Sequence, residues 1–341
     1  MQHPRRLVDT VYGTAMRWIS GGRLWLDSVV AGRVHLIWAF HRVRPAGQPR
    51  DPFDSCPSIS LDVLGALLEY VRDRFEVVGL NSLMQRRSGS KPLAAVTFDD
   101  GWRDNFDLAF PLLRELDIPA TVFVTTGKIG DCSPLWQQVL GSAFRTATVE
   151  PGPAAHRLRR AIGLEDTRTL DMRCYHETVR AWKTLPACQR EPLLLRACGD
   201  LGPAAGKHRL FLDEDEIREM SRGPVVFGSH GVSHSALPQL ERPAMQAELA
   251  QSKKRLQEIL GSEVDMLAYP YGDSSPEVVQ EARRAGYRIA CTTQGKRVGP
   301  KEDPLRLSRI VPGWDAGRTP HGLEEYLRRR AGHEENVNTG H

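Results

Sequence analysis

The sequence predicts an α/β fold, either a barrel or an open parallel sheet. Short apolar runs rich in β-branched and aromatic residues alternate along the chain with segments whose apolar residues recur at helical spacing. Repeated strand–helix units of this kind form parallel sheets, because each helix returns the chain to the edge where the preceding strand began. Polar residues that follow the strands then gather at one edge, where α/β proteins place their chemistry.

The individual elements follow from these patterns in chain order. Residues 61–74, for example, place Leu64, Leu67, Leu68 and Val71 on one helical face. Further helices are predicted over residues 105–116, 242–260 and 276–285. The strands are predicted over residues 34–40, 75–78, 93–98, 120–124, 225–227, 266–269 and 288–291.

A change of pattern predicts the domain organisation. Between about residues 130 and 212 the chain is arginine-rich and mostly helical, with Pro151-Gly152-Pro153 and Gly202-Pro203 as helix breakers. Strand–helix alternation resumes afterwards, which indicates an insertion. The predicted organisation is a helical extension at 1–33, a main domain at 34–325 with a helical insertion at about 130–212, and a disordered polar tail at 331–341.

Composition and charge argue against several classes of protein. The 341 residues carry a formal net charge of +4, and no basic stripe with interleaved aromatic residues suggests a nucleic-acid partner. No apolar stretch is long enough for a membrane span, and charged residues interrupt the N-terminal apolar residues where a signal peptide would need them. The six scattered cysteines include no Cys-x-x-Cys pair and fit reduced thiols in a cytoplasmic protein.

The N-terminal residues leave two interpretations open. Val8, Tyr12, Ala15 and Ile19 recur at helical spacing with arginines nearby. The favoured interpretation is a helix packed on the protein's own core, and the alternative is a basic helix in peripheral contact with the inner membrane surface. We therefore expect a cytoplasmic protein, with peripheral membrane contact as the alternative.

Two adjacent carboxylates, Asp99 and Asp100, follow the predicted strand 93–98 and precede Gly101. Only the end of a strand lets neighbouring side chains serve one site, because side chains within a strand point to opposite faces. Like charges at this separation repel, which suggests that a metal ion or a proton is shared between them. The alternative is a surface turn, for which Asp-Asp-Gly is a common composition.

Two histidines, His230 and His234, follow the predicted strand 225–227. Histidines four residues apart lie on one face of a helical turn, so their ring nitrogens can converge on one ion. Imidazole suits zinc and similar divalent metals, and a third oxygen ligand leaves a position open for water. A solvated pair of histidines on a helix is the alternative when this motif is considered alone.

The two motifs together are more specific than either alone. Each follows a buried strand in a repeating α/β pattern, so both are expected at the same rim. Two histidines and one aspartate would hold a metal ion, and the second aspartate would remain free as a base. This combination predicts metal-assisted hydrolysis of an acyl group.

A third motif, Tyr269-Pro270-Tyr271-Gly272, also follows a predicted strand. Aromatic residues beside a proline–glycine turn form a rigid wall, and aromatic faces suit sugar rings. We expect Tyr269, Pro270 and Tyr271 to contact substrate, with a purely structural turn as the alternative.

These three motifs, in this order and with these separations, resemble the first three motifs of the polysaccharide deacetylases, the NodB-homology proteins of carbohydrate esterase family four. The resemblance extends over roughly residues 34–312, interrupted by the insertion. Further similar segments are Arg103-Asp104-Asn105, Pro119-Ala120-Thr121-Val122-Phe123-Val124 and Ala285-Gly286-Tyr287.

The resemblance implies a deformed (β/α) barrel of about seven strands and removal of N-acetyl or O-acetyl groups from a polysaccharide or other glycan, in a setting such as exopolysaccharide biosynthesis. It implies Asp99 as the catalytic base. The implied cofactor is a divalent ion, zinc by preference, and its implied ligands are Asp100, His230 and His234. Tyr271 would line the site, and its backbone N–H would help to hold the oxyanion.

The sequence departs from the family pattern in two places. Family members often carry an arginine shortly before the proline of the third motif, where it orients the base, but this chain has Ala268 there. The late Leu-x-His motif, which supplies the general acid, is also missing. In some similar members the strand with that histidine comes first, so we hypothesise that His41, after strand 34–40, protonates the leaving amine.

Two alternatives to a glycan deacetylase remain at this stage. One is a deacetylase or deformylase of a nucleotide- or lipid-linked sugar precursor. The other is a catalytically impaired glycan-binding homologue, favoured by the missing arginine and disfavoured by the intact set Asp99, Asp100, His230 and His234.

Overall fold

The structure, a computed structural model, describes residues 35–83, 91–149, 152–164, 169–199, 208–295, 298–299 and 302–312. The predicted N-terminal extension at 1–33 and the predicted tail at 331–341 lie outside these residues. None of the helices in the described part is both long enough and apolar enough to span a bilayer. The six cysteines, all within the described residues, are free thiols.

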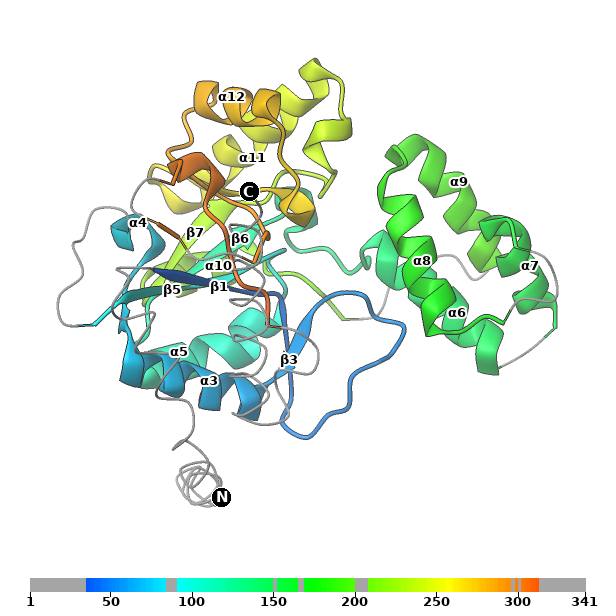
Figure 1. Ribbon diagram of the computed structural model, residues 1–341, viewed down its shortest axis with the longest axis horizontal. Coiled ribbons are helices and arrows are strands. Elements are labelled where there is room, and N and C mark those ends of the chain that lie inside the picture. Colours follow the sequence, from blue (N-terminus) through cyan, green and yellow to red (C-terminus); the bar gives the residue numbers. More distant parts are fainter. Residues whose placement is uncertain are drawn as a thin grey trace, which may run out of the picture.

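A curled parallel sheet forms the centre of the protein, in agreement with the predicted deformed barrel (Figure 1). Its strands follow the order β1-β5-β6-β7-β8-β9, and β4 pairs with β5. Every strand pair in this sheet is parallel. The strands are β1 (Leu36–Phe40), β4 (Glu76–Val77), β5 (Leu93–Phe98), β6 (Ala120–Val124), β7 (Val225–Ser229), β8 (Met266–Ala268) and β9 (Ile289–Cys291).

An irregular segment that the sequence patterns did not predict connects the two edges of this sheet. Leu307 pairs with Cys291 at the end of β9, and Ile310 pairs with Trp38 in the middle of β1. Backbone hydrogen bonds support the second pairing, with the Ile310 N–H donating to Ile37 and the Ala39 N–H donating to Ile310. The segment 305–310, hereafter the closing segment, thereby completes the barrel.

Alternation of side chains along the strands divides the core into an inner and an outer layer. Ile37, Ala95, Phe123 and Met266 belong to the buried cluster inside the barrel. Their neighbours along the strands, such as Trp38, pack outward against helices. Because both faces are buried, the strands are almost continuously apolar, which made them easy to recognise in the sequence.

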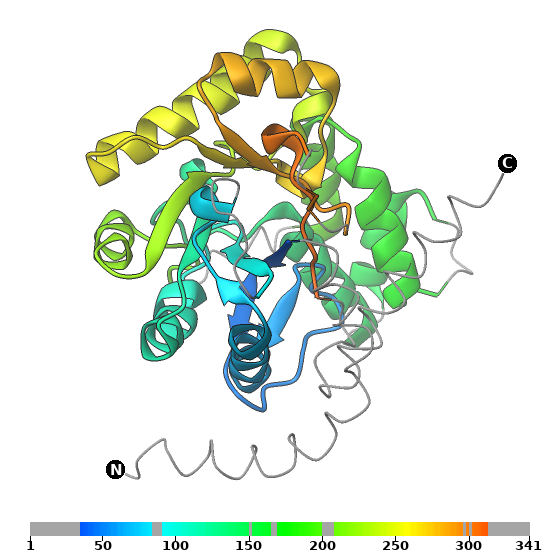
Figure 2. The same cartoon turned by 60° about the vertical axis from the view of Figure 1, so that its left-hand side comes forward.

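The helices between the strands cover the barrel from outside (Figure 2). In Figure 1, α3 and α5 lie below the sheet and α11 and α12 lie above it. Smaller elements add a second, two-stranded parallel sheet of β2 (Arg42–Arg44) and β3 (Ser58–Ser60). The covering helices are α3 (Leu61–Arg74), α5 (Phe110–Leu116), α10 (Glu214–Ser221), α11 (Arg242–Leu260) and α12 (Pro276–Arg284). A further short helix, α4 (Leu80–Leu83), contributes Leu80 and Leu83 to the inner cluster.

The helix predicted over residues 105–116 is not a single α-helix. It begins as a π-helical segment, Asn105–Ala109, in which the Phe110 N–H donates to the Asn105 carbonyl, and continues as α5. Pro111 has no N–H to complete an α-helical bond at this point, so the wider turn is tolerated there. The Asn105 side chain donates to the His41 carbonyl and so ties this turn to the end of β1.

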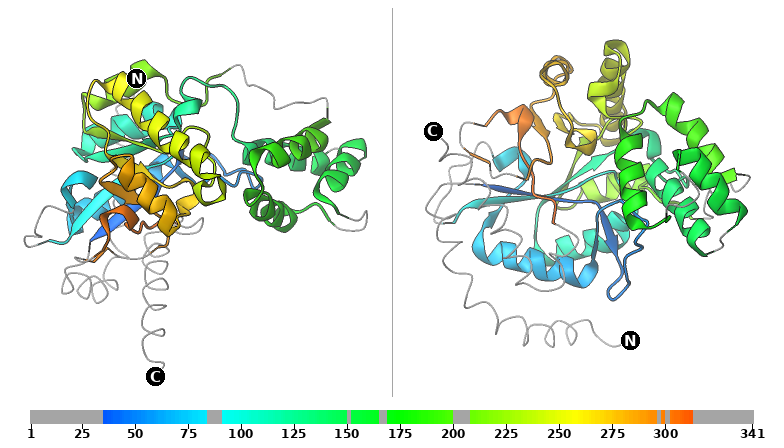
Figure 3. Two further views of the ribbon diagram at one scale, coloured as in Figure 1. Left: turned by 90° about the horizontal axis from the view of Figure 1, so that it is seen from above. Right: turned by 45° about the vertical axis from the view of Figure 1, so that its right-hand side comes forward.

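The inserted stretch forms a group of helices beside the barrel (Figures 1 and 3). The group has its own buried cluster, which includes Leu140, Phe144, Leu158 and Tyr175. Phe53, from the loop before β3, stacks on Phe144 and so connects this loop to the insertion. The helices are α6 (Trp136–Val149), α7 (Pro153–Ile162), α8 (Met172–Lys183) and α9 (Ala187–Cys198).

Candidate active site

The first motif lies at the carboxyl end of β5. Asp100 has a φ of 74°, in the left-handed region that Asp tolerates better than most residues, and Gly101 follows with a φ of 78°. This turn brings Asp99 and Asp100 to the same side of the chain end, although each residue is only 2% exposed. The Thr125 N–H donates to the Asp100 carbonyl and holds the turn against the end of β6.

The second motif lies in a loop after β7 and not on the helical turn that we predicted. Gly231 and His234 both have positive φ values, 77° and 59°, which a right-handed helix does not allow. Glu248, on α11, accepts hydrogen bonds from the N–H groups of Val232 and Ser233 at 2.6 and 3.0 Å. These bonds replace the helical ones and fix the loop in a form that still brings both histidines together.

Asp100, His230 and His234 form a buried cluster whose potential ligand atoms lie within 4.8 Å of one another. The Nε2 atoms of His230 and His234 lie 3.4 and 3.2 Å from Asp100 Oδ1. His230 is oriented by a contact of 2.7 Å between its Nδ1 and the Ala268 carbonyl, which leaves Nε2 directed at the cluster. A bond of this kind to the second ring nitrogen is typical of histidines that bind metals.

The donor set of this cluster fits a divalent metal ion. Trp102, stacked on Phe211, donates its indole N–H to Asp100 Oδ2 at 2.8 Å. The other carboxylate oxygen, Oδ1, has no hydrogen-bond partner among the residues that the structure describes, although it is buried. A buried oxygen without a donor, facing two imidazole nitrogens, is satisfied by a cation such as zinc.

Asp99 has a partner that the sequence analysis missed. Arg309, on the closing segment, donates from Nη1 and Nη2 to the two oxygens of Asp99 at 2.7 and 2.6 Å. The same guanidinium donates to Thr97 Oγ1 and to the Thr292 carbonyl, and its exposed fraction is 0%. Many family members orient the base with an arginine at the position of Ala268. In this chain Arg309, from a different part of the sequence, contacts Asp99 in its place.

The Arg309 guanidinium decides the ionisation of Asp99. Burial works to raise the pKa of Asp99, but the charge and hydrogen bonds of Arg309, together with His230, hold that pKa below its usual value. Asp99 is therefore a carboxylate at neutral pH. A single arginine in an irregular segment gives no periodic pattern in the sequence. Arg309 reaches Asp99 only because the closing segment pairs with β9 and β1.

His41, which we predicted as the general acid, lies at the end of β1 beside these carboxylates. Its Nε2 is 3.9 Å from Asp99 Oδ2. Burial holds the pKa of His41 below its ordinary value, and the charges of Asp100 and Asp99 oppose that effect. The structure thus brings His41 into the same pocket as Asp99, Asp100, His230 and His234.

The residues of the third motif divide between the core and the site. Tyr271 lines the pocket, and its ring lies 4.5 Å from the His234 ring. Tyr269 is fully buried in the core beside α11 and α12, and its hydroxyl donates to the Leu305 carbonyl. Pro270 is buried and does not line the pocket. Of the three expected substrate contacts, only Tyr271 faces the pocket.

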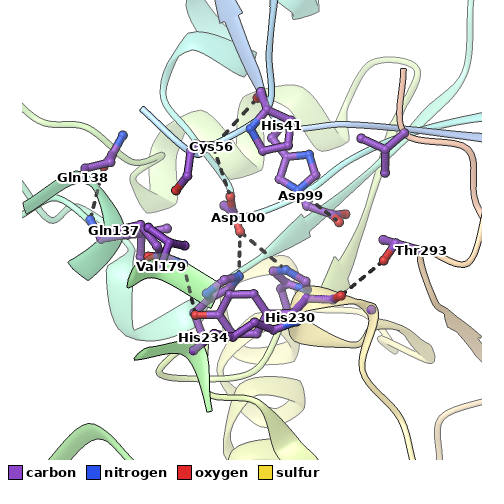
Figure 4. A pocket seen from close by; sticks show the side chains of 17 residues that line it. His41, Cys56, Asp99, Asp100, Gln137, Gln138, Val179, His230, His234 and Thr293 are labelled. Carbon is purple, nitrogen blue, oxygen red and sulfur yellow. Dashed lines mark hydrogen bonds and ion pairs between the residues drawn. The ribbon is translucent and has the colours of Figure 1, made fainter. Parts of the chain in front are cut away.

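The site residues open into a pocket of about 260 Å³ (Figure 4). In the close view, His41 and Asp99 lie on one side of the pocket, and Gln137 and Val179 lie near His234 on another. The barrel contributes the chemical groups, while the insertion contributes much of one wall. The insertion residues in the lining are Leu135, Gln137, Gln138, Val179 and Lys183.

Known structures share this architecture. The deacetylase PplD from Streptococcus pyogenes, solved in complex with acetate, superposes with a TM-score of 0.56 at 18% identity, over 86% of this chain and 98% of that one. IcaB from Ammonifex degensii gives a TM-score of 0.55 at 19% identity, over 87% of this chain and 98% of that one. These likenesses establish the fold of the chain, which belongs to the class of deformed (β/α) barrels that these two structures share.

The sequence comparison gives the family itself. Residues 86–159 and 188–290, just over half of the chain, match the model of the polysaccharide deacetylase family. The chain belongs to this family of hydrolases. A curated relative, the polysaccharide deacetylase homologue YxkH of Bacillus subtilis, is 20% identical over 228 residues, which cover 67% of this chain. The matched region spans about half of that relative, 54% of its length.

Proposed function

We propose that this protein is a metal-dependent hydrolase that removes acetyl groups from a glycan. The observation that carries the proposal is the division of roles between the two aspartates. Asp100 faces two histidines through an oxygen without a donor among the described residues, whereas both oxygens of Asp99 are held by Arg309. The first arrangement suits a cation, and the second holds a carboxylate in its ionised form beside it.

The reaction follows from these roles. A divalent ion held by Asp100, His230 and His234 would polarise the acyl carbonyl and lower the pKa of a water molecule. Asp99 accepts the proton of the attacking water, and the backbone N–H of Tyr271 donates to the developing oxyanion. His41 donates a proton to the leaving nitrogen, so that the amine departs in neutral form.

The shape of the site favours a glycan of more than one sugar over a sugar precursor. Beside the pocket lies a second cavity of about 460 Å³, and Tyr271, Gly272 and Thr293 line both. Polar residues in the lining of the second cavity suit sugar hydroxyls. These residues are Gln239, Asp273, Ser274 and Gln294. An N-acetylated segment of a polysaccharide, such as an exopolysaccharide, would place neighbouring sugars in the two cavities.

Metal removal tests the proposed activity directly. Treatment with a chelator is expected to lower acetate release from the best substrate at least tenfold, and added zinc or another divalent ion is expected to restore it. The measurement is an acetate-release screen over N-acetylated and O-acetylated oligosaccharides, a nucleotide-linked sugar and a lipid-linked sugar. Acetate release that survives complete metal removal would contradict the proposed metal dependence. Faster release from the nucleotide-linked or lipid-linked sugar than from the oligosaccharides would show that the substrate is a sugar precursor and not a polysaccharide.

Replacing His41 by Ala tests the general acid. The variant is expected to lower kcat on an N-acetylated sugar about 100-fold, because an amine leaves poorly without a proton. On an O-aryl acetate, whose leaving group needs no proton, the loss is expected to be below about tenfold. Metal content, measured by elemental analysis, should be unchanged. Equal losses on the two substrates, or retained activity on the amide, would refute the role.

A further inference from the structure

Tyr271 has an unusual backbone conformation at the edge of the site. Its φ of 63° and ψ of 2° place it in the left-handed region, which an aromatic residue adopts only when its surroundings hold it there. The preceding proline and the following Gly272, with a φ of 73°, complete the turn. The direction of the Tyr271 backbone N–H therefore depends on the contacts that keep its side chain in place.

The groups that hold the Tyr271 side chain come from the insertion. Trp136 Nε1 and Gln137 Nε2, both in the first turn of α6, donate to the Tyr271 hydroxyl at 3.0 and 3.1 Å. The ring itself faces the imidazole of His234, with 4.5 Å between the two ring centres. The residue is thus held between the insertion and the metal-binding cluster.

A second contact joins the insertion to the same turn. Lys183, at the end of α8, pairs with Asp273 at 2.8 Å and lies 4.7 Å from the centre of the Tyr271 ring. The match to the family model is interrupted between residues 159 and 188, and this gap contains α8. This part of the contact is therefore contributed by a segment outside the matched regions.

We propose that Trp136 and Gln137 are positioning residues for catalysis. By fixing the Tyr271 hydroxyl they hold the ring against His234, and they thereby hold the strained backbone whose N–H serves the oxyanion. The inserted helices then act as part of the catalytic apparatus as well as a wall of the pocket. This inference rests on the proposed function, since it assigns a purpose to the conformation of Tyr271 in the same reaction.

A double-mutant cycle tests the inference. Trp136→Phe and Tyr271→Phe each remove one partner of the same hydrogen bond and keep an aromatic ring. Each is expected to lower kcat about three- to tenfold, with KM within about twofold and with unchanged metal content. If Trp136 acts through the Tyr271 hydroxyl, the double variant will be no slower than Tyr271→Phe alone. If the fold reductions in kcat of the two single variants multiply in the double variant, the two residues act independently and the inference is overturned.

A matched control separates positioning from general loosening of the insertion. Phe144→Leu changes a fully buried residue of the same helix that does not line the pocket. It is expected to lower the thermal stability more than Trp136→Phe does and to leave kcat within about twofold of the unmodified protein. A loss of kcat in Phe144→Leu equal to that in Trp136→Phe would show that any weakening of the insertion suffices, and would overturn the specific role.

A readout without catalysis distinguishes this inference from the proposed function. Amide hydrogen exchange in the peptide that contains residues 269–273 is expected to become several times faster in Trp136→Phe, while peptides of β5 and β6 keep their rates. Faster exchange in a protein that releases no acetate would leave the hold on Tyr271 in place and refute only the proposed function. Unchanged exchange, with acetate release intact, would refute the hold alone.

Discussion

Replacing Asp99 by Asn is expected to lower kcat for acetate release about 1000-fold, because an amide of the same shape cannot accept the proton of the attacking water. The metal content should stay that of the unmodified protein, since Asp99 is not among the proposed ligands. KM should change little, because the shape of the pocket is preserved. Steady-state kinetics with elemental analysis of the same preparations provide the measurement.

The stability of this variant needs a control. The Asp99→Asn substitution leaves the buried Arg309 without its counter-charge, and the loss of one partner from a buried pair costs on the order of 3–5 kcal/mol in unfolding free energy. The double variant Asp99→Asn with Arg309→Met removes both charges and should recover part of that loss while remaining inactive. Acetate release by Asp99→Asn at the rate of the unmodified protein would contradict the proposed mechanism.

Replacing Arg309 by Met is expected to lower the unfolding free energy by about 3–5 kcal/mol and kcat by about 100-fold. The methionine fills similar space but leaves Asp99 buried without the guanidinium that donates to both of its oxygens. Lysine should recover part of the activity, because it restores the charge without the paired hydrogen bonds of the guanidinium. Urea unfolding and kinetics measure the two effects, and Arg288→Met, at an exposed site paired at 3.7 Å, is the matched control.

The pH dependence gives the Arg309 prediction a clear sign. Arg309 holds the pKa of Asp99 below its usual value, so the stabilisation is present above the unfolded pKa of about 4 and is lost as the pH falls through the lower folded pKa. Without Arg309, the effect of burial on Asp99 is opposed less strongly, and its pKa rises. The acidic limb of kcat/KM is therefore expected to move to higher pH. Two results together would contradict the coupling between Arg309 and Asp99. The acidic limb of kcat/KM would stay in place in Arg309→Met, and the stability losses of Asp99→Asn and Arg309→Met would add in the double variant.

Elements with strong local signals could be predicted from the sequence. The strands of the barrel were recognised because both of their faces are buried, and the helix over residues 61–74 has the bounds observed for α3. The convergence of Asp100 with His230 and His234 followed from parallel topology, since each motif comes after a strand. His41 was proposed from the resemblance to family members in which the strand with the histidine comes first, and the structure places it beside Asp99.

Features that depend on tertiary contacts could not be predicted. The loop of His230 and His234 is set by Glu248 on a distant helix, so spacing alone suggested the wrong local structure. Tyr269 was expected to contact substrate because aromatic residues suit sugars, but its side chain packs instead in a buried hydrophobic cluster. The closing segment lacks regular periodicity, and Arg309 could not be connected with Asp99, which lies 210 residues earlier.

The closing segment also has a consequence for the order in which the protein matures during synthesis. The partner of Asp99 is among the last described residues to leave the ribosome, long after the strand that carries the carboxylate. Until that segment docks between β9 and β1, the barrel remains open and the carboxylate lacks the counter-charge of Arg309. The proposed base therefore receives its counter-charge only once the barrel is sealed, so formation of the ion pair between Asp99 and Arg309 reports that the barrel has closed.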